Sequence, residues 1–590
     1  MKYINNRTFE PTPGAATRYL NKLGIYDIES FLYKPKPSDY ISPWSLNNME
    51  EMVAALNEVF TKNKKIFLQV DSDTDGITSS AIFYNFFTSV FPEAQIEYRV
   101  HEGKEHGVIL DTIPVDAQVI VIPDAGSNQL DEQEALAYQG RTVLIMDHHV
   151  VNHFQDLDNV IIVNNQTSEL YHNKNLSGAG VVYKVIEAYC QKYLNNEPRY
   201  KNYEDLAALG IIADCMDCRT LDNNAIVMNG LNRINNPMLA QFLEKQSAGG
   251  LRIKNPKNPT KIDIAFYVAP LINAVIRSGT LEEKTQLFES FIGVGYNETF
   301  TTEWRGEIRR ESLYEYVART AVNLRARQNR MKEKSIESLV EMVEKQGLQN
   351  NKVLILKVGT ETVHKNITGL VAMDMVNTFN KPTLVLRPVV ETRDGKRCVF
   401  YRGSGRAQEV AGFNNFMAVL QESGLMEYVE GHENAFGASV LEENIPALTE
   451  FLNDKLADID FANCNFVDCC LNDRNWNNVV LKEFGAMERI YGNGIPEPKF
   501  HLEFDAKSSD FRIQGSNNDS LKISHNGTTL IKFKCADLIS EYKKLAKTPF
   551  SKIHVEVIGT SSINSWNGYD NVQIKIQEIE LTEVEETSLF

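Results

Sequence analysis

The sequence lacks the features that mark a membrane protein or a secreted one. It has no run near the roughly 18 consecutive apolar residues that a membrane-spanning helix requires. Its first residues, MKYINNR, lack the apolar stretch of a signal peptide. Its eight cysteines show no disulfide framework, since Cys215 and Cys218 form a lone Cys-x-x-Cys and Cys469 and Cys470 are adjacent. We therefore expect a soluble cytoplasmic protein with reduced thiols and no membrane partner.

An excess of positive charge is also absent. Sixty-one Lys and Arg residues stand against 78 Asp and Glu residues, which gives a net charge of −17. This balance argues against a surface that binds polyanions over its whole extent. It is still compatible with a local basic groove, because net charge says little about the charge of one face. At 590 residues the chain is too long for a single hydrophobic core, because domains hold about 100–200 residues. Three or four domains are therefore expected.

What the chain does have is a series of aspartates at the ends of apolar segments. Three apolar runs, residues 65–70, 117–122 and 141–146, have the composition of buried parallel strands, and a fourth, 209–213, is of helix or strand type. The polar residues that follow them are Asp71, Asp73, Asp75, Asp124, Asp147, His148, His149 and Asp214. Because ligands of open α/β sheets bind at the carboxyl ends of the strands, we expect these side chains to meet.

Such a gathering of acids implies a cation. Carboxylates brought to one place repel each other and cannot all ionise unless a positive charge compensates them. Oxygen ligands with a neutral imidazole favour Mn²⁺ or Mg²⁺ over Zn²⁺. The alternative is four ordinary turns, which are rich in Asp and Gly anyway. That alternative explains any single cluster well but all four together poorly.

The rest of the chain divides into regions that differ in composition and in predicted secondary structure. Residues 1–62 are predicted to be a helical lead-in, residues 63–260 an α/β domain with a parallel sheet, and residues 261–348 a connecting helical region with a long exposed helix from about 301. Residues 349–460 repeat an α/β pattern, and residues 461–590 contain short strands typical of a small antiparallel barrel, with an acidic tail.

Two glycine-rich stretches have competing interpretations. Residues 401–406 and 430–437 place glycines beside arginines, a serine and a histidine, a composition that favours a phosphate cradle but also fits a glycine-rich hairpin. Residues 177–180, Ser-Gly-Ala-Gly, open a predicted helix whose N-terminus either faces an anion or forms a packing turn. The basic run at 325–334 fits a solvated helical face better than a nucleic-acid contact.

In their order and spacing, the four acidic clusters resemble the motifs of the DHH phosphoesterase superfamily. Residues 269–274 and the later arginine are similar to a stretch of the RecJ-like nucleases. Residues 403–406 and 431–432 resemble the signatures of the DHHA1 domain, and residues 492–498 and 566–576 resemble the RecJ OB portion. The resemblance covers residues 65–580, with a DHH domain at 63–260, a DHHA1 domain at 349–460 and an OB-like domain at 461–590.

The resemblance implies a 5′→3′ exonuclease of single-stranded DNA that acts in repair or recombination with two Mn²⁺ or Mg²⁺ ions. Monomeric action and recruitment by a helicase or a single-strand-binding protein are expected. By position, the metal ligands would be Asp73, Asp75, Asp124, His148 and Asp214, and the other catalytic residues His149, Asp147 and Asp71. The nucleic-acid contacts would be Asn273, Arg277, Arg402, Ser404, Arg406, His432 and Trp566. For Trp566, core packing in the barrel is an equally good interpretation.

Three positions depart from the family pattern. Gln69 stands where many members have a ligand histidine, so we expect Asp71 to compensate or one metal to bind more weakly. Leu271 replaces an arginine, which removes one phosphate contact. Glu430 replaces the first glycine of a Gly-Gly-His motif.

Two other functions are compatible with parts of the sequence. A relative that cleaves short oligonucleotides or cyclic dinucleotides would not need the OB-like tail. A catalytically silent DNA-binding scaffold would have lost the acids, whereas all four clusters persist here.

Overall fold

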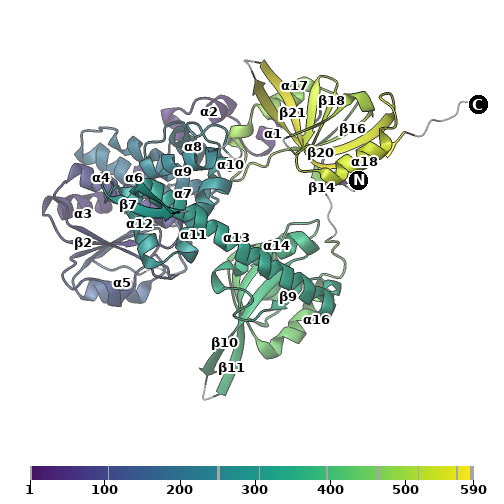
Figure 1. Ribbon diagram of the computed structural model, residues 1–590. Helices are drawn as coiled ribbons and strands as arrows, with labels where there is room; N and C mark the ends of the chain where they lie inside the picture. Colours follow the sequence, from purple (N-terminus) through teal and green to yellow (C-terminus); the bar gives the residue numbers. More distant parts are fainter. Residues whose placement is uncertain are drawn as a thin grey trace, which may run out of the picture. The chain divides into compact units, whose positions relative to one another are not determined.

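The computed structural model describes residues 3–103, 105–153, 155–248, 253–304, 306–393, 396–461, 465–515, 517–566 and 569–584. The chain forms two compact units, Met1–Ile276 with Thr280–Thr320 and Asn465–Phe590, and Arg277–Gly279 with Ala321–Cys464 (Figure 1). Among the described residues, no helix combines the length and the apolar character needed to span a membrane.

The first unit contains the predicted parallel sheet. Its strand order is β3-β2-β4-β5-β6, and all four pairings are parallel. The strands are β2 (Ile66–Val70), β3 (Ile96–Val100), β4 (Val119–Pro123), β5 (Thr142–Asp147) and β6 (Val160–Asn164). The chain runs from β2 outward to β3 and then returns to the other side of β2 as β4. The carboxyl ends of β2 and β4 therefore flank the point where the strand order reverses, which is where such sheets bind ligands.

Helices cover this sheet because its strands are apolar on both faces. Every residue of β2 and β4 is buried. The helices of this region include α3 (Met49–Thr61), α4 (Thr74–Val90), α5 (Leu130–Tyr138), α6 (Gly178–Tyr193), α7 (Glu204–Ala213), α8 (Leu221–Asn232), α9 (Pro237–Ser247), α11 (Ala269–Ser278) and α12 (Leu281–Ile292). The apolar run at 209–213, left open between helix and strand by its composition, is the end of α7.

The C-terminal part of the first unit is a seven-stranded sheet in the order β15-β16-β20-β21-β19-β18-β17. Its strands are β15 (Cys469–Asn472), β16 (Lys499–Lys507), β17 (Phe511–Gln514), β18 (Ser520–His525), β19 (Thr528–Lys532), β20 (Lys552–Trp566) and β21 (Tyr569–Glu583). The predicted antiparallel pairing holds for most neighbours, but β15 with β16 and β19 with β21 are parallel. The helices α17 (Asn478–Gly485) and α18 (Ala536–Leu545) occupy connections between strands.

The N-terminal residues take part in the core of this C-terminal sheet. Strand β1 (Tyr3–Asn5) pairs with β14 (Asn465–Val467), and α1 (Ala15–Lys22) follows it. Phe9 stacks on Phe484 with ring centroids 4.4 Å apart, and Tyr19 and Leu20 are buried in the same cluster. Two segments far apart in the sequence thus share one hydrophobic core.

The second unit is a mixed five-stranded sheet in the order β12-β13-β11-β10-β9. Its strands are β9 (Leu354–Lys357), β10 (Thr383–Arg393), β11 (Lys396–Arg406), β12 (Met426–His432) and β13 (Ala435–Leu441). Its helices include α14 (Thr368–Phe379), α15 (Phe416–Glu422) and α16 (Ile445–Lys455).

The predicted long connecting helix is α13 (Leu313–Gln346). It starts later than the charge pattern indicated, because residues before it form the hairpin of β7 (Thr299–Trp304) and β8 (Glu307–Ser312). Gly306, at φ 82°, provides the left-handed backbone that the turn of the hairpin requires. The β-branched residues of β7 favour a strand over a helix.

Removing the Phe9 side chain should loosen the C-terminal sheet rather than the parallel sheet. Phe9→Ala deletes a buried aromatic ring, a change that costs about 3–5 kcal/mol in protein cores. Faster amide hydrogen exchange in β16 is expected, measured by mass spectrometry. Phe533→Ala, at a largely exposed ring, is the control. Unchanged exchange in β16 would show that the N-terminal segment contributes nothing to this core.

Candidate metal centre

The turn after β2 presents three aspartates in succession. Asp73 is the N-cap of α4, and its carboxylate accepts the N–H of Gly76 at 2.9 Å. Asp75 lies in the first turn of α4 and accepts the N–H groups of Gly178 at 2.6 Å and Ala179 at 3.1 Å. These amides open α6, so the helix N-terminus predicted at residues 177–180 does face an anion, which is Asp75 itself.

Asp124 follows β4 in a backbone conformation that few side chains adopt. Its φ is 66°, in the left-handed region, and its N–H donates to the carbonyl of Met146 at 2.8 Å. Its carboxylate is buried, and Oδ1 makes no hydrogen bond, although His148 Nε2 lies 3.2 Å away. A Cβ at Gly178 would collide with this carboxylate, so only glycine fits beside it. A strained residue with an unsatisfied buried oxygen is a feature that a bound cation would explain.

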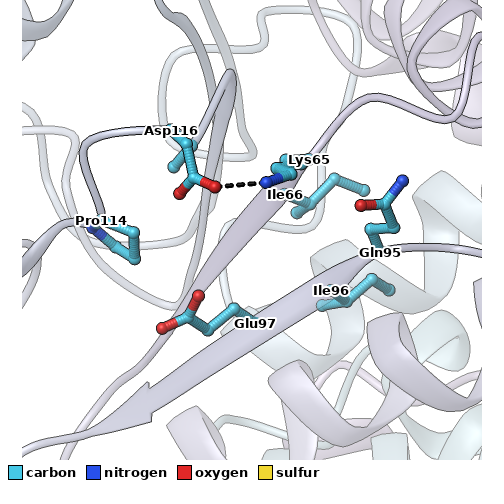
Figure 2. Close-up of a pocket in the computed structure, with 8 residues that line it drawn as sticks. Lys65, Ile66, Gln95, Ile96, Glu97, Pro114 and Asp116 are labelled. Atoms are coloured by element: carbon cyan, nitrogen blue, oxygen red, sulfur yellow. Dashed lines mark hydrogen bonds and ion pairs between the residues drawn. The ribbon is translucent and has the colours of Figure 1, made fainter.

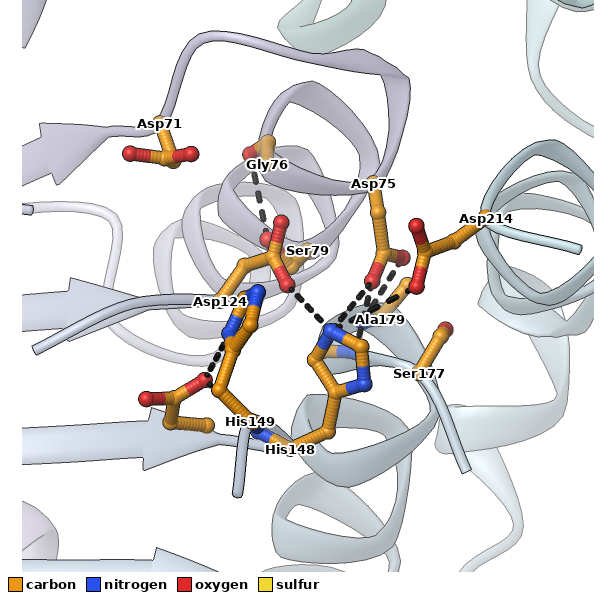
Figure 3. Close-up of polar contacts among 12 residues, drawn as sticks. Asp71, Asp75, Gly76, Ser79, Asp124, His148, His149, Ser177, Ala179 and Asp214 are labelled. Atoms are coloured by element: carbon orange, nitrogen blue, oxygen red, sulfur yellow. Dashed lines mark hydrogen bonds and ion pairs between the residues drawn. The ribbon is translucent and has the colours of Figure 1, made fainter. Parts of the chain in front are cut away.

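His148 is the point at which the acids converge (Figure 3). Its Nε2 lies 3.2 Å from Asp124 Oδ1, 3.5 Å from Asp214 Oδ2 and 3.9 Å from Asp75 Oδ2. These acids follow β4, cap the end of α7 and lie at the start of α4. Ligand atoms of Asp75, His148 and Asp214 lie within 4.8 Å of one another, and so do carboxylate oxygens of Asp71, Asp73 and Asp124. Asp124 links the two sets, because its Oδ1 lies 3.2 Å from His148 Nε2.

The acids are poorly tolerated without a cation. Burial, followed by repulsion from Asp75 and other carboxylates, raises the pKa of Asp124 well above its usual range. Burial and neighbouring aspartates raise the pKa of Asp214 to about 8 and that of Asp73 to about 6. Burial lowers the pKa of His148, which keeps its imidazole neutral as a metal ligand requires. The donor set therefore fits a hard divalent cation such as Mn²⁺ or Mg²⁺.

His149 lies in a different electrostatic environment from His148. Its Nδ1 is 2.8 Å from Asp147 Oδ1, and this hydrogen bond raises the pKa of His149 to about 9. Burial opposes ionisation of Asp147, but its bond to His149 and nearby charge outweigh it and hold the pKa of Asp147 below its usual range. The remaining oxygen of Asp147 accepts the N–H of Ser127 at 3.0 Å. Asp147 therefore orients His149.

A second histidine–aspartate pair, which no sequence motif indicated, lies beside Asp71. His106 Nδ1 is 2.8 Å from Asp71 Oδ2, and the N–H of Gly107 donates to Oδ1 at 2.9 Å. Gln69, at the position of the absent histidine, lies with its amide nitrogen 3.3 Å from Nε2 of the buried His101. His101 Nε2 also lies 3.8 Å from Asp71 Oδ1, so the loop after β3 brings two imidazoles to Asp71. A histidine distant in sequence from any motif offers no local signal.

The candidate nucleic-acid residues lie in several places. Asn273, on α11, accepts a hydrogen bond from Thr74 at 3.1 Å, next to Asp73. Trp566 ends β20, and its side chain lies outside the described residues. Arg402 is on β11, where its guanidinium pairs with Glu391 at 2.7 Å.

The other candidates gather in the second unit around the start of α14. Ser404 Oγ lies 2.9 Å from Thr368 Oγ1. Arg406 lies against Gly369, and burial, followed by repulsion from Arg277, lowers the pKa of Arg406. A helix N-terminus, two hydroxyls and two crowded guanidinium groups have the chemistry of an anion site. Thr368 was not predicted.

His432 faces the same side of that sheet as Arg406. Both pair with Ala435 of β13, His432 from β12 and Arg406 from β11. Side chains of directly paired residues point to one face of a sheet.

One hollow of the parallel-sheet region lies elsewhere. A pocket of about 290 Å³ is lined by Ile66, Ile96 and the ion-paired Lys65 and Asp116, among others (Figure 2). These residues stand at the amino ends of β2, β3 and β4, the opposite edge from the aspartates. It plays no part in the metal centre.

Comparison with known proteins agrees with this architecture. Residues 65–211 match the DHH family, N-terminal domain, and residues 467–578 match the RecJ OB domain. The chain is 31% identical over 589 residues to YorK of the Bacillus subtilis SPbeta prophage, covering 99% of this chain and 98% of YorK, whose name describes a single-strand DNA-specific exonuclease. It is 24% identical to the single-stranded-DNA-specific exonuclease RecJ of Bacillus subtilis, covering 93% of this chain and 65% of RecJ.

A solved structure shares the fold. The crystal structure of RecJ in complex with Mn²⁺ from Thermus thermophilus matches with a TM-score of 0.66 at 22% identity, covering 91% of this chain and 72% of that one. These matches confirm the resemblance inferred from the sequence motifs.

Replacing Asp124 by Asn should stabilise the metal-free protein and remove its response to metal. The neutral amide relieves buried repulsion, and each kcal/mol of relief raises the melting temperature by about 2–4 °C in a domain of this size. Mn²⁺ should stabilise the wild type and not the variant. Differential scanning calorimetry with and without Mn²⁺ measures both effects. Asp116→Asn, at the opposite sheet edge, is the control. If metal-free Asp124→Asn protein melts at a lower temperature than the wild type, repulsion among the buried carboxylates does not destabilise the metal-free site.

Proposed function

We propose, because this chain belongs to the DHH family and has a RecJ OB domain, that it is a metal-dependent exonuclease of single-stranded DNA. The observation that carries the proposal is the convergence of Asp75, Asp124 and Asp214 on His148 Nε2. The descriptions of YorK and RecJ, which both specify single-stranded DNA, support the substrate class. Involvement in DNA repair or recombination is part of the proposal.

Two divalent cations are expected, Mn²⁺ or Mg²⁺. One would be held by Asp75, His148 and Asp214, whose ligand atoms lie within 4.8 Å of one another, with Asp124, whose Oδ1 lies 3.2 Å from His148 Nε2. The other would be held by Asp73 and Asp124 with Asp71 nearby. When bound, such a pair supplies an activated water and neutralises charge on the attacked phosphate. Asp124 is the candidate shared ligand because it belongs to the set with Asp71 and Asp73 and its Oδ1 lies 3.2 Å from His148 Nε2 of the other set.

The protein itself supplies the remaining electrostatics. His149, cationic through its bond to Asp147, can donate a hydrogen bond to a non-bridging phosphate oxygen. Its proton stays on the ring through neutral pH because its pKa is raised to about 9. Asp147 fixes the ring orientation, as in other carboxylate–histidine pairs. Asn273, whose side-chain oxygen accepts a hydrogen bond from Thr74 beside Asp73, would contact the same strand.

Binding of the 5′ end is assigned to the cradle of the second unit. A terminal phosphate would be held by Ser404, Arg406, Arg277 and the start of α14, with His432 on the same face of the sheet. Arg402 is a weaker candidate because its guanidinium already forms an ion pair with Glu391. Such binding of the 5′ end gives 5′→3′ polarity. The C-terminal sheet, Trp566 included, would hold the strand without reading sequence.

Loss of a central ligand should abolish the activity. Asp124→Ala removes a carboxylate from both ligand sets, so Mn²⁺-dependent release of nucleotides from a labelled single strand should fall to background. Asp116→Ala is the matched control, an acid of the same domain that pairs with Lys65 at the other sheet edge. Wild-type rates with Asp124→Ala would exclude this metal centre as the catalytic site.

The phosphate cradle predicts a polarity that the same assay measures. A blocked 5′ terminus should protect a single strand, whereas a blocked 3′ terminus should not. Arg406→Ala should raise KM for 5′-phosphorylated strands by about 10-fold or more, as loss of a charge-assisted contact of about 1.5–3 kcal/mol implies. Arg393→Ala, an exposed arginine on the adjacent strand paired with Glu427, is the control. Protection by a 3′ block alone would reverse the proposed direction.

A further inference from the structure

The C-terminal domain contacts the turn that presents Asp214. Residues Gly492, Asn493 and Gly494 form a tight loop before β16, and all three have positive φ. The amide nitrogen of the Asn493 side chain lies 3.3 Å from the carbonyls of Ile211 and Ile212 and 3.2 Å from that of Met216. In the other direction, the N–H of Cys218 donates to the Asn493 carbonyl at 2.8 Å. The loop therefore holds both sides of the turn that follows α7.

That turn is a Schellman cap with an unfavourable residue in it. The N–H of Met216 donates to Ile211, and the N–H of Cys215 donates to Ile212, the two bonds of the motif. The position that usually holds glycine is Cys215, with φ 57°. A residue with a Cβ is strained in this left-handed region. The cap thus needs support from outside the helix.

Asp214 has a second difficulty, which the same loop relieves. It is the C-cap of α7, at the negative end of the helix, where a carboxylate is disfavoured. The carbonyls of Ile211 and Ile212 accept the two bonds of the cap, and each oxygen keeps a second lone pair. Asn493 donates to both of these carbonyls and so reduces the negative potential beside Asp214.

The loop is seated closely. A Cβ at Gly494 would collide with the Asp217 carboxylate, and the buried Lys261 donates to the Gly492 carbonyl at 3.1 Å. Asn493 is a residue that tolerates left-handed backbone while also offering a side-chain N–H₂. Glycine at position 493 would keep the left-handed backbone but lose the side-chain N–H donor. Aspartate would keep the side-chain shape but replace the N–H donor by an acceptor oxygen.

We propose that Asn493, in the C-terminal domain, is a positioning residue for the metal ligand Asp214. It acts through the strained cap of α7, so that seating of the strand-binding domain sets the affinity of the ion held by Asp75, Asp124, His148 and Asp214. The inference rests on the proposed metal centre and deepens it: the domain that holds DNA also completes the site that cleaves it.

The test is a titration of metal-free, full-length protein with Mn²⁺, followed by electron paramagnetic resonance of the free ion. Asn493→Gly should weaken one of the two ions by about 10-fold or more, as loss of an outer hydrogen-bond partner does in other metal sites. Asn493→Asp should weaken it further, because its carboxylate repels the carbonyls. Asn526→Gly, another left-handed asparagine of the same domain, is the matched control and should bind as the wild type does.

A rescue separates positioning from general damage to the fold. Cys215→Gly relieves the strain of the cap, so in the Asn493→Gly background it should restore most of the lost Mn²⁺ affinity, whereas alone it should change affinity little. Equal Mn²⁺ binding by wild type and Asn493→Gly, or purely additive effects of the two substitutions, would overturn the proposal. Because DNA is absent from this titration, a protein that binds Mn²⁺ as expected yet does not degrade single strands would refute the proposed nuclease function alone.

Discussion

Repulsion among buried carboxylates is the constraint on which the rest of the structure depends. Asp75 and Asp124 are both nearly inaccessible, and Asp124 has an oxygen without a hydrogen-bond partner. The fold tolerates them through specific local devices. The N-terminal amides of α6 hold Asp75, and Gly178 and Gly210 leave room where a Cβ would collide with these acids. Each device makes the crowded acids tolerable in one place, which a site for a divalent cation requires.

The two adjacent histidines show how one motif produces two chemistries. His148 is buried among acids with its pKa lowered, so it offers a lone pair. His149 is half exposed and bonded to Asp147, which raises its pKa to about 9, so it offers a proton and a charge. A ligand must be neutral, and a group that stabilises a phosphate anion is better charged. Burial of His148 and the bond of His149 to one carboxylate are enough to move the pKa values of two adjacent histidines in opposite directions.

The sequence predicted those parts of the site that follow from strand ends. Asp71 and Asp124 terminate apolar runs, and the rule for parallel sheets places them together without further information. His106 and Thr368 escaped prediction because nothing in their neighbours distinguishes them. The packing of Phe9 on Phe484 and the hydrogen bonds of Asn493 to α7 join residues hundreds of positions apart, and no local periodicity encodes such contacts. The hairpin before α13 was not predicted because the many charged residues from about 301 onward indicated an exposed helix, although the threonines of β7 favour a strand.

Separation of charge between the two units follows from the same repulsion. The carboxylates of the metal centre contact histidines and backbone N–H groups, for instance Asp73 with Gly76 and Asp124 with His148. An arginine placed among them would compete with the metal for the same oxygens. The guanidinium groups suited to a phosphate, Arg277 and Arg406, instead lie in the second unit, where their own repulsion favours an anion. In a chain with a net charge of −17, these guanidinium groups therefore lie on different elements from the clustered acids, as binding of a polyanion by an acidic protein would require.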